Sequence, residues 1–276
     1  MKYPELDLAL ARRLEHAEAQ AAVESADALQ RMRPGAQAAV ERIAGGVAVF
    51  TGVDSPLTQA VEVGLWGPVT AEELDNLESF YTSRGDAVRV ELCPLADASV
   101  IELFGKRNYG VTEFSNVLLR PLSLGETWAG APRGLVIEKI GEKDAELWAG
   151  TVAQGFAEQF PVTPQLLEVV QMFAYCPGAE CYLARWEAEP AGGSSLSLRD
   201  GVAGLFGAST LPAFRKRGIQ TALLHHRLAR GVAEGCDIAM SIAQPGSASH
   251  RNIERQGFRV AYTRVKFQKG KSKQAL

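Results

Sequence analysis

The sequence has few of the residues that build disulfide frameworks or metal sites. Its 276 residues include four cysteines and four histidines. No two cysteines form a Cys-x-x-Cys pair, and no histidine stands near a cysteine at the spacing of a zinc site. We therefore expect no metal and reduced thiols, in the core or at the surface, at Cys93, Cys176, Cys181 and Cys236.

Long apolar runs and a strong charge of either sign are also missing. Nowhere do about 18 apolar residues follow one another, and the start Met1–Asp7 carries acids instead of the apolar stretch of a secretory leader. The net charge of -3 and the pI near 5.9 argue against a general nucleic-acid surface. We expect a cytoplasmic protein that binds neither membrane nor nucleic acid and acts on a small molecule.

Apolar residues are abundant, at 46%, which suffices for one large or two modest domains. In the first half, periodicity predicts a helix over Leu6–Met32 that Pro34-Gly35 closes. A capping box is expected at Thr70 and Glu73. The other predicted elements are strands Val47–Thr51, Gln59–Leu65, Ala87–Leu92 and Val111–Arg120, and helices Thr70–Ser83 and Asp97–Arg107.

The second half shows the same alternation of strands and helices. Gly192-Gly193 is interpreted as a hairpin turn between two of its strands. The predicted strands are Leu135–Ile140, Glu180–Glu187, Ser194–Leu198, Val202–Thr210, Asp237–Ala243 and Phe258–Phe267. The predicted helices are Lys143–Gln159, Thr163–Tyr175, Ile219–Ala233 and Ser247–Gln256.

The two halves also share positions at a nearly constant shift. Val88, Val90 and Leu92 match Ile238, Met240 and Ile242 at a shift of 150 residues. A duplicated fold is our hypothesis, and chance similarity between two α/β halves is the alternative. The small residues of Ala129–Gly134 predict the boundary, so the expected domains are 1–130 and 134–268, followed by a basic tail, 269–276.

The most informative stretch begins with the apolar strand Val202–Thr210. Pro212 ends this strand, the cations Arg215, Lys216 and Arg217 follow, and Gly218 precedes a helix. A helix start has unpaired N–H groups, so together with these cations it predicts an anion site. A basic triplet alone would be an ordinary solvated surface, but its place between strand and helix favours pyrophosphate.

The segment Thr210-x-Pro212-x-x-Arg215-x-Arg217-Gly218-Ile219-Gln220-Thr221-Ala222-Leu223-Leu224 resembles the pyrophosphate-binding segment of the GNAT superfamily of acyl-CoA-dependent N-acyltransferases. One departure is Gln220, where the family has a small residue. The resemblance covers about 134–268. It implies an α/β (α+β) fold with a mixed central sheet flanked by helices, in two tandem copies.

In the first copy, Leu65–Glu73 places acids where the second has Arg215–Gly218, so this copy is degenerate and we expect it to be structural or to shape the substrate site. No separate final strand follows Phe267, and the first half is expected to supply it.

The resemblance also implies acetyl-CoA (CoA) as cofactor. Backbone groups of Ala208, Ser209 and Thr210 would hold its pantetheine arm. Its phosphates would meet Arg215, Lys216, Arg217, Gly218, Ile219, Gln220, Thr221 and Ala222. Ser249 and Asn252, on the helix before Gly257-Phe258, are further expected cofactor contacts, with ordinary surface positions as the alternative.

Two usual catalytic groups are missing. Many family members have a tyrosine general acid four residues before Gly-Phe, where this chain has Ile253, and Val202–Thr210 contains no carboxylate base. Ser249 is the expected substitute acid, with Tyr262 as the other choice. Weaker candidates are His225, His226, His250, Glu187 and Glu189.

The predicted activity is therefore acetyl-CoA-dependent N-acetyl transfer to a primary amine, by direct attack and without a covalent enzyme intermediate. The alternative is a non-catalytic acyl-CoA-binding or regulatory module that keeps the cofactor cleft. A nucleotide-binding protein of another α/β type is disfavoured, because the basic loop lacks Gly-Lys-Ser/Thr.

Overall fold

The structure, a computed structural model, describes residues 2–157 and 161–270. Its contacts divide the chain into two compact units. Arg120–Ser241 form one, which we call the continuous unit, and Tyr3–Leu119 with the segment from Ile242 onward form the other, the split unit. The domain limits expected from the sequence, 1–130 and 134–268, stay a prediction.

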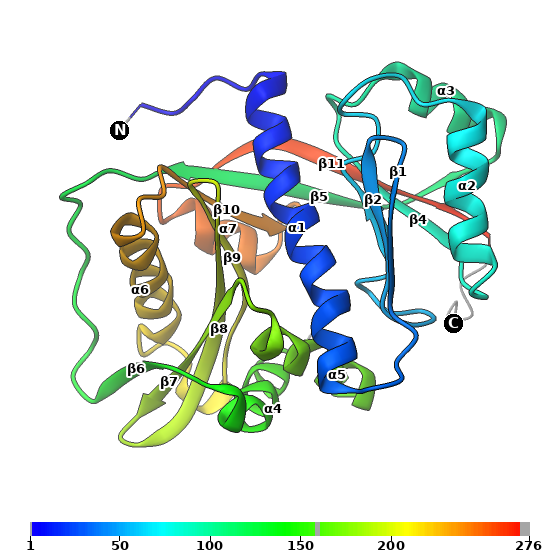
Figure 1. The fold of residues 1–276 in the computed structure, drawn as a ribbon. Coiled ribbons are helices and arrows are strands. Elements are labelled where there is room, and N and C mark those ends of the chain that lie inside the picture. Colours follow the sequence, from blue (N-terminus) through cyan, green and yellow to red (C-terminus); the bar gives the residue numbers. More distant parts are fainter. Residues whose placement is uncertain (1, 158–160, 271–276) are drawn as a thin grey trace. The chain divides into compact units, whose positions relative to one another are not determined.

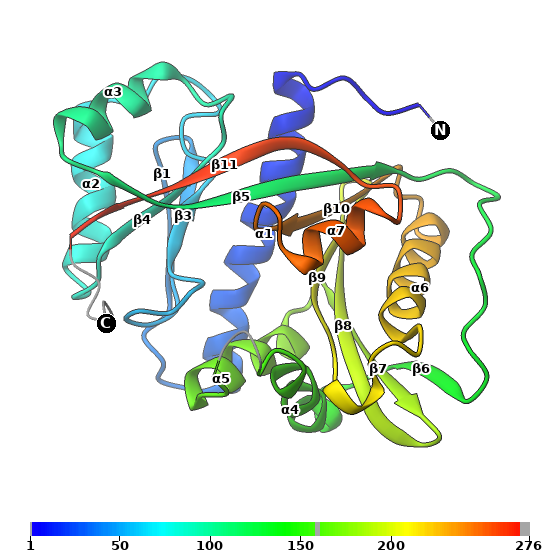
Figure 2. The ribbon, with the colours of Figure 1, turned by 180° about the vertical axis from the view of Figure 1, so that it is seen from behind.

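The continuous unit is a mixed sheet with helices on both faces. Its strand order is β10-β9-β8-β7-β6, in which β9 and β10 are parallel and the other neighbours antiparallel. Figures 1 and 2 show α6 on one side of this sheet and α4 and α5 on the other. The elements are β6 (Leu135–Lys139), η1 (Glu142–Asp144), α4 (Ala145–Gly155), α5 (Pro164–Met172), η2 (Phe173–Tyr175), β7 (Ala179–Trp186), β8 (Glu189–Arg199), β9 (Val202–Thr210), η3 (Pro212–Phe214), α6 (Ile219–Ala233) and β10 (Ile238–Ala243).

The strands of the split unit follow the order β1-β2-β3-β4-β11-β5. Strand β11, from the end of the chain, pairs antiparallel with β4 on one side and β5 on the other. The strands beside β11 thus come from the first half, and the separate final strand expected for the second copy stays a prediction. The elements are α1 (Leu8–Met32), β1 (Ala39–Ile43), β2 (Gly46–Phe50), β3 (Gln59–Val61), α2 (Ala71–Thr82), β4 (Val88–Leu92), α3 (Ala98–Lys106), β5 (Gly110–Pro121), α7 (Ala248–Glu254) and β11 (Arg259–Lys269).

The two units repeat one topology, which confirms the predicted duplication. In the split unit β1, β2 and β3 are antiparallel neighbours, and helix α2 connects β3 to the parallel strand β4. In the continuous unit β7, β8 and β9 are antiparallel neighbours, and helix α6 connects β9 to the parallel strand β10. The loop before α2 therefore holds the same place in the order as the basic loop before α6.

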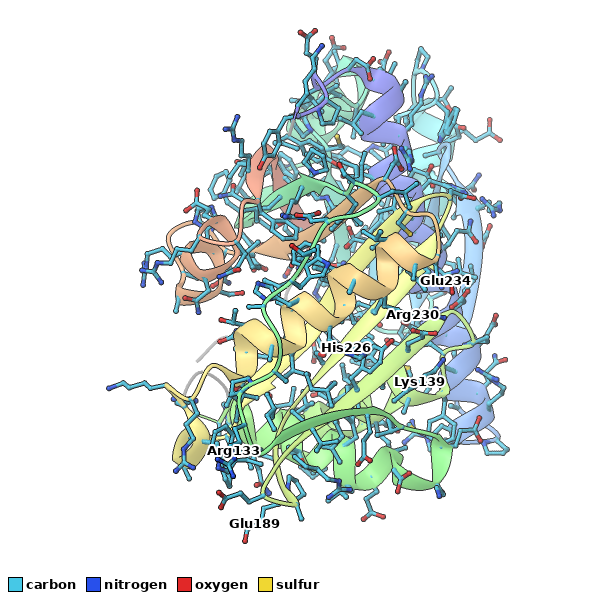
Figure 3. The ribbon with its side chains drawn as sticks, turned by 90° about the vertical axis from the view of Figure 1, so that its left-hand side faces the viewer. Arg133, Lys139, Glu189, His226, Arg230 and Glu234 are labelled. Carbon is cyan, nitrogen blue, oxygen red and sulfur yellow. The ribbon has the colours of Figure 1, made fainter. Side chains whose placement is uncertain are left out.

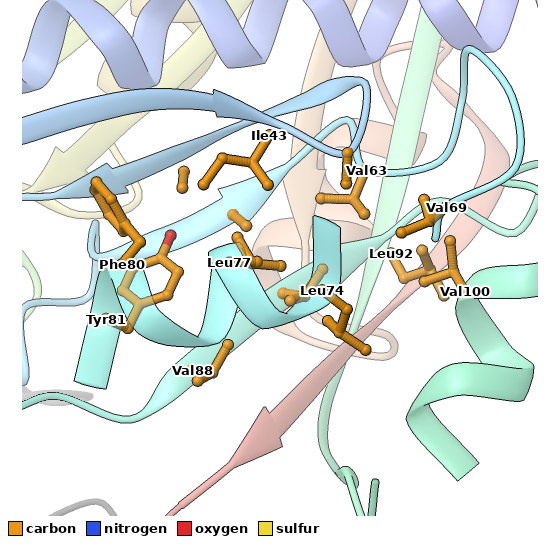
Figure 4. Close-up of a cluster of buried hydrophobic side chains, with 14 of the residues drawn as sticks. Ile43, Val63, Val69, Leu74, Leu77, Phe80, Tyr81, Val88, Leu92 and Val100 are labelled. Atoms are coloured by element: carbon orange, nitrogen blue, oxygen red, sulfur yellow. The ribbon is translucent and has the colours of Figure 1, made fainter. Parts of the chain in front are cut away.

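Strand alternation explains the two-sided core of the split unit. Val47 and Val49 face α1, whereas Ala48 and Phe50, the alternate residues, face α2. Figure 4 shows Leu74 and Leu77 of α2 packed against this second face. Thr70 caps α2 as predicted, because its hydroxyl accepts the Glu73 N–H while the Glu73 carboxylate accepts the Thr70 N–H.

The predicted hairpin turn at Gly192-Gly193 is wrong. Both glycines lie inside β8, and the turn is at Glu187 and Ala188, with φ of 50° and 73°. The glycines are needed for close packing instead. A Cβ on Gly193 would lie 2.7 Å from Val152 Cγ2 and 2.8 Å from Trp148 Nε1 on α4, and a Cβ on Gly192 would lie 2.6 Å from the carbonyl oxygen of Ser209.

Most other elements match their predictions to within a few residues. The helix expected over Lys143–Gln159 ends at Gly155, and the last two residues of that prediction, 158 and 159, lie outside the described residues. The four cysteines are buried, and none of them is in a disulfide. Among the described residues, no helix is long and apolar enough to span a bilayer.

Candidate cofactor site

Strand β9 has one residue more than β8 over part of their paired length. Gly193 pairs with Ser209 and Ser195 with Phe206, so two steps along β8 correspond to three along β9. The extra residue is a β-bulge at Gly207–Ala208. Gly207 has a φ of +57°, and a Cβ there would lie 3.1 Å from Ser195 Oγ, so glycine is favoured at this position.

Beyond Leu205, β9 leaves its parallel partner. The ladder between β9 and β10 ends at the pair Leu205–Ser241. The Leu211 N–H donates to the Ala191 carbonyl on the β8 side at 2.9 Å. Because N–H groups alternate in direction along a strand, Thr210 directs its own N–H away from β8. Within the described residues, the end of β9 therefore has one edge to which an extended ligand could be added.

The turn after β9 enters α6 through two left-handed residues, Lys216 (φ 63°) and Gly218 (φ 78°). Gly218 caps α6 without a side-chain hydrogen bond. The Ala222 N–H donates to the Gly218 carbonyl at 3.0 Å, and the N–H groups before it belong to the open first turn. A Cβ on Gly218 would also lie 3.3 Å from Pro132 Cγ, so glycine suits both the backbone angle and the space.

The three predicted phosphate cations differ in their contacts. Arg215 is half-buried and donates to the carbonyls of Thr210 (Nε, 3.3 Å) and Gly155 (3.1 Å), so it braces the loop. Lys216 and Arg217 are exposed. The Arg217 guanidinium lies 5.3 Å from the ring centre of Trp186, a cation–π contact. The exposed positive charge at the start of α6 therefore comes from Lys216 and Arg217.

The other predicted residues of the first turn alternate between core and solvent. Ile219 and Ala222 are buried, whereas Gln220 and Thr221 are exposed. The two exposed side chains stand beside the open N–H groups. The side chain of Gln220, the departure from the family pattern, is thus exposed to solvent, and the turn at Gly218 keeps its conformation.

The end of α4 packs directly on the end of β9. The Ser209 hydroxyl is buried and donates to the Val152 carbonyl at 2.8 Å. A Cβ on Gly155 would lie 2.3 Å from Ser209 Oγ. The side chain of Ser209 is thus engaged in this packing, and any cofactor contact there would have to come from backbone groups.

A buried arginine that the sequence analysis did not single out lies behind the bulge. Arg227 on α6 is 3% exposed. Its guanidinium donates to the carbonyls of Ser195 (2.9 Å) and Phe206 (3.3 Å), and its Nε to the Leu223 carbonyl (3.2 Å). Burial lowers the pKa of Arg227 to about 10, which leaves it charged at neutral pH. The spacing of Ile219, Leu223 and Arg227 along the helix could have indicated this buried position.

One orphaned atom tests whether acetyl-CoA fits these residues. Thr210 Oγ1 is buried and has no hydrogen-bond partner among the described residues. It stands where the open edge of β9 meets the basic turn. A pantetheine arm has amides that can pair with a strand edge, and its diphosphate suits a helix start with two exposed cations. The residues present therefore fit the group.

The predicted contacts on α7 belong to the split unit. Ser249 is exposed, and the Asn252 side-chain oxygen accepts a hydrogen bond from Arg255 at 2.9 Å. Ser247 caps the helix by accepting the His250 N–H at 3.1 Å. The roles of Ser249 as acid and of Asn252 as cofactor contact stay predictions.

The weaker catalytic candidates have structural partners. Tyr262 is buried and donates to Glu15 at 2.6 Å, and desolvation raises its pKa, so it is a poor proton donor. His250 has Asn116 at 3.4 Å and Glu254 at 3.8 Å. The ring of His225 lies 5.4 Å from that of Trp128. His226 packs edge-on against Tyr182, and burial lowers its pKa, so both α6 histidines are half-buried rather than free at the surface.

The other end of α6 is held by an ion cluster. Figure 3 shows His226, Arg230 and Glu234 along the side of α6 that faces the strand with Lys139. Arg230 and Lys139 both bind Glu180, at 3.0 Å and 2.7 Å. Hydrogen bonds from Arg230, and then from Lys139, lower the pKa of Glu180 to about 2. Glu187 forms the β7–β8 turn, and Glu189 is exposed beside it.

Comparisons with known proteins concern the family and the fold. The sequence model of the acetyltransferase (GNAT) family matches residues 150–258. No curated protein matches the sequence. Among solved structures, a GCN5-related N-acetyltransferase from Kribbella flavida is 16% identical, with a TM-score of 0.59, over 92% of this chain and 95% of that chain.

Two further solved structures share the fold. A tandem GNAT protein from the clavulanic acid biosynthesis pathway is 14% identical, with a TM-score of 0.59, over 90% of this chain and 88% of that chain. A functionally unknown conserved protein from Staphylococcus epidermidis is 11% identical, with a TM-score of 0.56, over 86% of this chain and 96% of that chain. These likenesses confirm the predicted tandem fold, and residues 150–258 match the sequence model of the acetyltransferase (GNAT) family.

Proposed function

We propose that the protein is an acetyl-CoA-dependent N-acetyltransferase that acts on a primary amine. The observation that carries this proposal is the open edge of β9 leading, within one unit, into the helix start at Gly218. The edge would hold the pantetheine amides, and Lys216, Arg217 and the first-turn N–H groups of α6 would hold the diphosphate. When bound, acetyl-CoA would supply a thioester carbonyl that the amine attacks directly, which forms the amide and releases the thiol.

The chain's own residues would act mainly by placement. Fixing two reactants in attack geometry can supply most of a rate enhancement. Ser249 is the proposed proton donor to the departing sulfur, since Tyr262 is buried on Glu15 and Ile253 carries no proton to give. A thiol with a pKa of about 8.5 needs only modest help to leave. If Ser249 is the acid, Ser249→Ala should lower turnover by about 10²-fold.

Thermal unfolding with and without acetyl-CoA tests the cofactor assignment. A ligand at 100 times its Kd should stabilise the folded state by about 2.7 kcal/mol. Lys216→Glu combined with Arg217→Glu should abolish this shift, because the two exposed cations are reversed while the brace at Arg215 is kept. Lys143→Glu is the matched control, because it reverses the charge of an exposed lysine on η1. No shift for the parent protein at millimolar acetyl-CoA would refute the assignment.

A non-catalytic acyl-CoA-binding module is the second candidate, favoured by Ile253 at the usual tyrosine position. Both candidates bind acetyl-CoA, so binding does not separate them. Release of free thiol in the presence of a panel of primary amines does. Binding without release for every amine class tested would favour the module over the enzyme.

A further inference from the structure

The segment between β5 and β6, residues 122–134, lies along helix α6, and we call it the strap. At one end, the Leu122 N–H donates to the Asp237 carbonyl at 2.7 Å, and Leu122 Cδ1 lies 3.3 Å from the Cβ position of Gly231 on α6. At the other end, Pro132 Cγ lies 3.3 Å from the Cβ position of Gly218, directly before α6. Figure 3 shows the strap crossing this helix toward Arg133. The strap therefore contacts both ends of α6.

An indole holds the middle of the strap on the helix. The centre of the Trp128 ring lies 5.4 Å from that of His225, which belongs to α6. The Arg120 guanidinium lies 4.7 Å from the centre of the same indole, a cation–π contact. Arg120 Nη1 also donates to Glu126 Oε2 of the strap at 3.1 Å. The path of the strap is thus fixed between its ends, although most of its residues are small.

The backbone on both sides of Arg133 is fixed as well. The Leu135 N–H donates to the Pro132 carbonyl at 3.0 Å, which closes a turn around Arg133. The Gly134 carbonyl, directly after Arg133, accepts the Glu187 N–H from the β7–β8 turn at 2.9 Å. The side chain of Arg133 is exposed, and within the described part of the chain it has no hydrogen bond or ion pair. Its charge is therefore held in place by the backbone and is available to a ligand.

This charge lies at the start of α6. Arg133 directly follows the proline that contacts Gly218, and successive Cα atoms are about 3.8 Å apart. It is the only cation of the strap, whose one other charged residue, Glu126, is already bound by an arginine. Lys216 and Arg217 are exposed on the turn itself. Three exposed cations from two separate segments therefore meet at this helix start.

Two cations are few for the ligand proposed for this turn. Coenzyme A carries a diphosphate and a phosphate monoester, together about four negative charges at neutral pH. Lys216 and Arg217 offset about half of that charge. Thr210 Oγ1, which is buried without a partner, independently indicates a ligand here, because the Thr210 carbonyl accepts from Arg215 of the same turn at 3.3 Å. A further cation beside this turn would therefore strengthen binding.

We propose that Arg133 is a further acyl-CoA-binding residue, which the strap brings to the start of α6 and which Trp128 keeps there. This inference rests on the proposed function. It gives the segment that joins the two halves a part in cofactor binding, whereas the sequence predicts only a domain boundary there. The guanidinium acts on the phosphate-bearing end of the cofactor, because that end carries the negative charge.

Calorimetry with acetyl-CoA tests the charge. Arg133→Gln should weaken the Kd about three- to fivefold, the size of one exposed ion pair. Arg133→Lys, which keeps the charge, should stay within about twofold of the wild type. In about 0.5 M NaCl the ratio of the Gln-variant and wild-type Kd values should fall toward 1, because salt screens exposed charges. Lys143→Gln is the matched control, since it removes an exposed lysine on η1, and it should leave the Kd unchanged.

A double variant tests the strap. Trp128→Ala removes the contact with α6, so it should weaken the Kd about as much as Arg133→Gln does. The two changes combined should cause no further loss, because Arg133 contributes only while the strap holds it in place. Losses that add fully in the double variant would refute the part assigned to Trp128.

The outcomes separate this inference from the proposed function. A wild-type Kd for Arg133→Gln, or a loss that is equally large in 0.5 M NaCl, would overturn the inference and leave the proposed function standing. If Trp128→Ala does not fold, the Arg133 variants decide alone, because replacing an exposed side chain leaves the fold intact. Failure of the wild type to bind acetyl-CoA overturns both.

Discussion

Replacing Gly193 by alanine should destabilise the protein by about 1–5 kcal/mol, although alanine is normally the better residue for folding. The new Cβ would lie 2.7 Å from Val152 Cγ2 and 2.8 Å from Trp148 Nε1, far inside ordinary contact. The methyl group gains about 1 kcal/mol from burial and reduced chain entropy. Against this, Trp148 must move, and its hydrogen bond to the Tyr182 carbonyl, 3.0 Å long, is lost at a cost of about 1–3 kcal/mol in addition to the overpacking.

Urea unfolding, followed by tryptophan fluorescence and by circular dichroism, measures this change. Gly150→Ala is the control, because Gly150 lies on α4 and a Cβ there would meet nothing within 4 Å. Alanine at position 150 should stabilise the protein by about 0.5–1 kcal/mol, so the two variants should shift the midpoint in opposite directions. A neutral or stabilising Gly193→Ala would refute the argument that close packing, and not turn formation, requires this glycine.

Three further predictions follow from buried or paired groups. Arg264 is fully buried on Glu15 (2.7 Å) and two other carboxylates, so Arg264→Met should cost about 3–5 kcal/mol in urea unfolding, and pairing it with Glu15→Gln should recover part of the loss. Because the pKa of Glu180 falls from 4.5 to about 2 on folding, its ion pairs stabilise the protein above pH 4.5, and about 1–3 kcal/mol is lost as the pH drops from 4.5 toward 2; Glu180→Gln should flatten this part of the stability–pH curve. Burial raises the pKa of Cys93 and of Cys181 to about 12, so both thiols should react with Ellman's reagent only after urea is added, and rapid reaction of the native protein would contradict the burial.

The backbone of the basic loop was predictable because its signal is local. A proline after an apolar strand, three cations and a glycine before a helix all act within about ten residues, and the structure places each where the pattern requires. The left-handed φ of Gly218 is the backbone angle that the sequence predicts most directly, because only glycine adopts such an angle without strain. The duplication of the fold was also predictable from the sequence, because the apolar strands recur at one spacing.

The parts that sequence reasoning missed depend on neighbours far along the chain. Gly192 and Gly193 resemble a turn, yet Gly193 is small because α4, about 40 residues earlier, packs on it, and Gly192 because Ser209 of β9 lies against it. The real turn uses Glu187 and Ala188, which carry a Cβ and so give no local signal for a positive φ. Arg227 stands beside two histidines on a helix with a basic start, and nothing within the helix reveals that a strand bulge receives its guanidinium.

The position of β11 has a consequence for synthesis on the ribosome. Strands β4 and β5 are complete once residue 121 has been made, but the strand that lies between them begins at Arg259. At about 5–20 residues per second, the intervening stretch of about 140 residues takes roughly 7–28 s to emerge. Throughout that interval, the edges that β11 will cover offer unpaired backbone groups to any other strand. The nascent chain therefore spends about half of its translation with two unpaired strand edges that can bind other strands. Its yield in the cell should depend on chaperones that cover those edges until β11 has been synthesised.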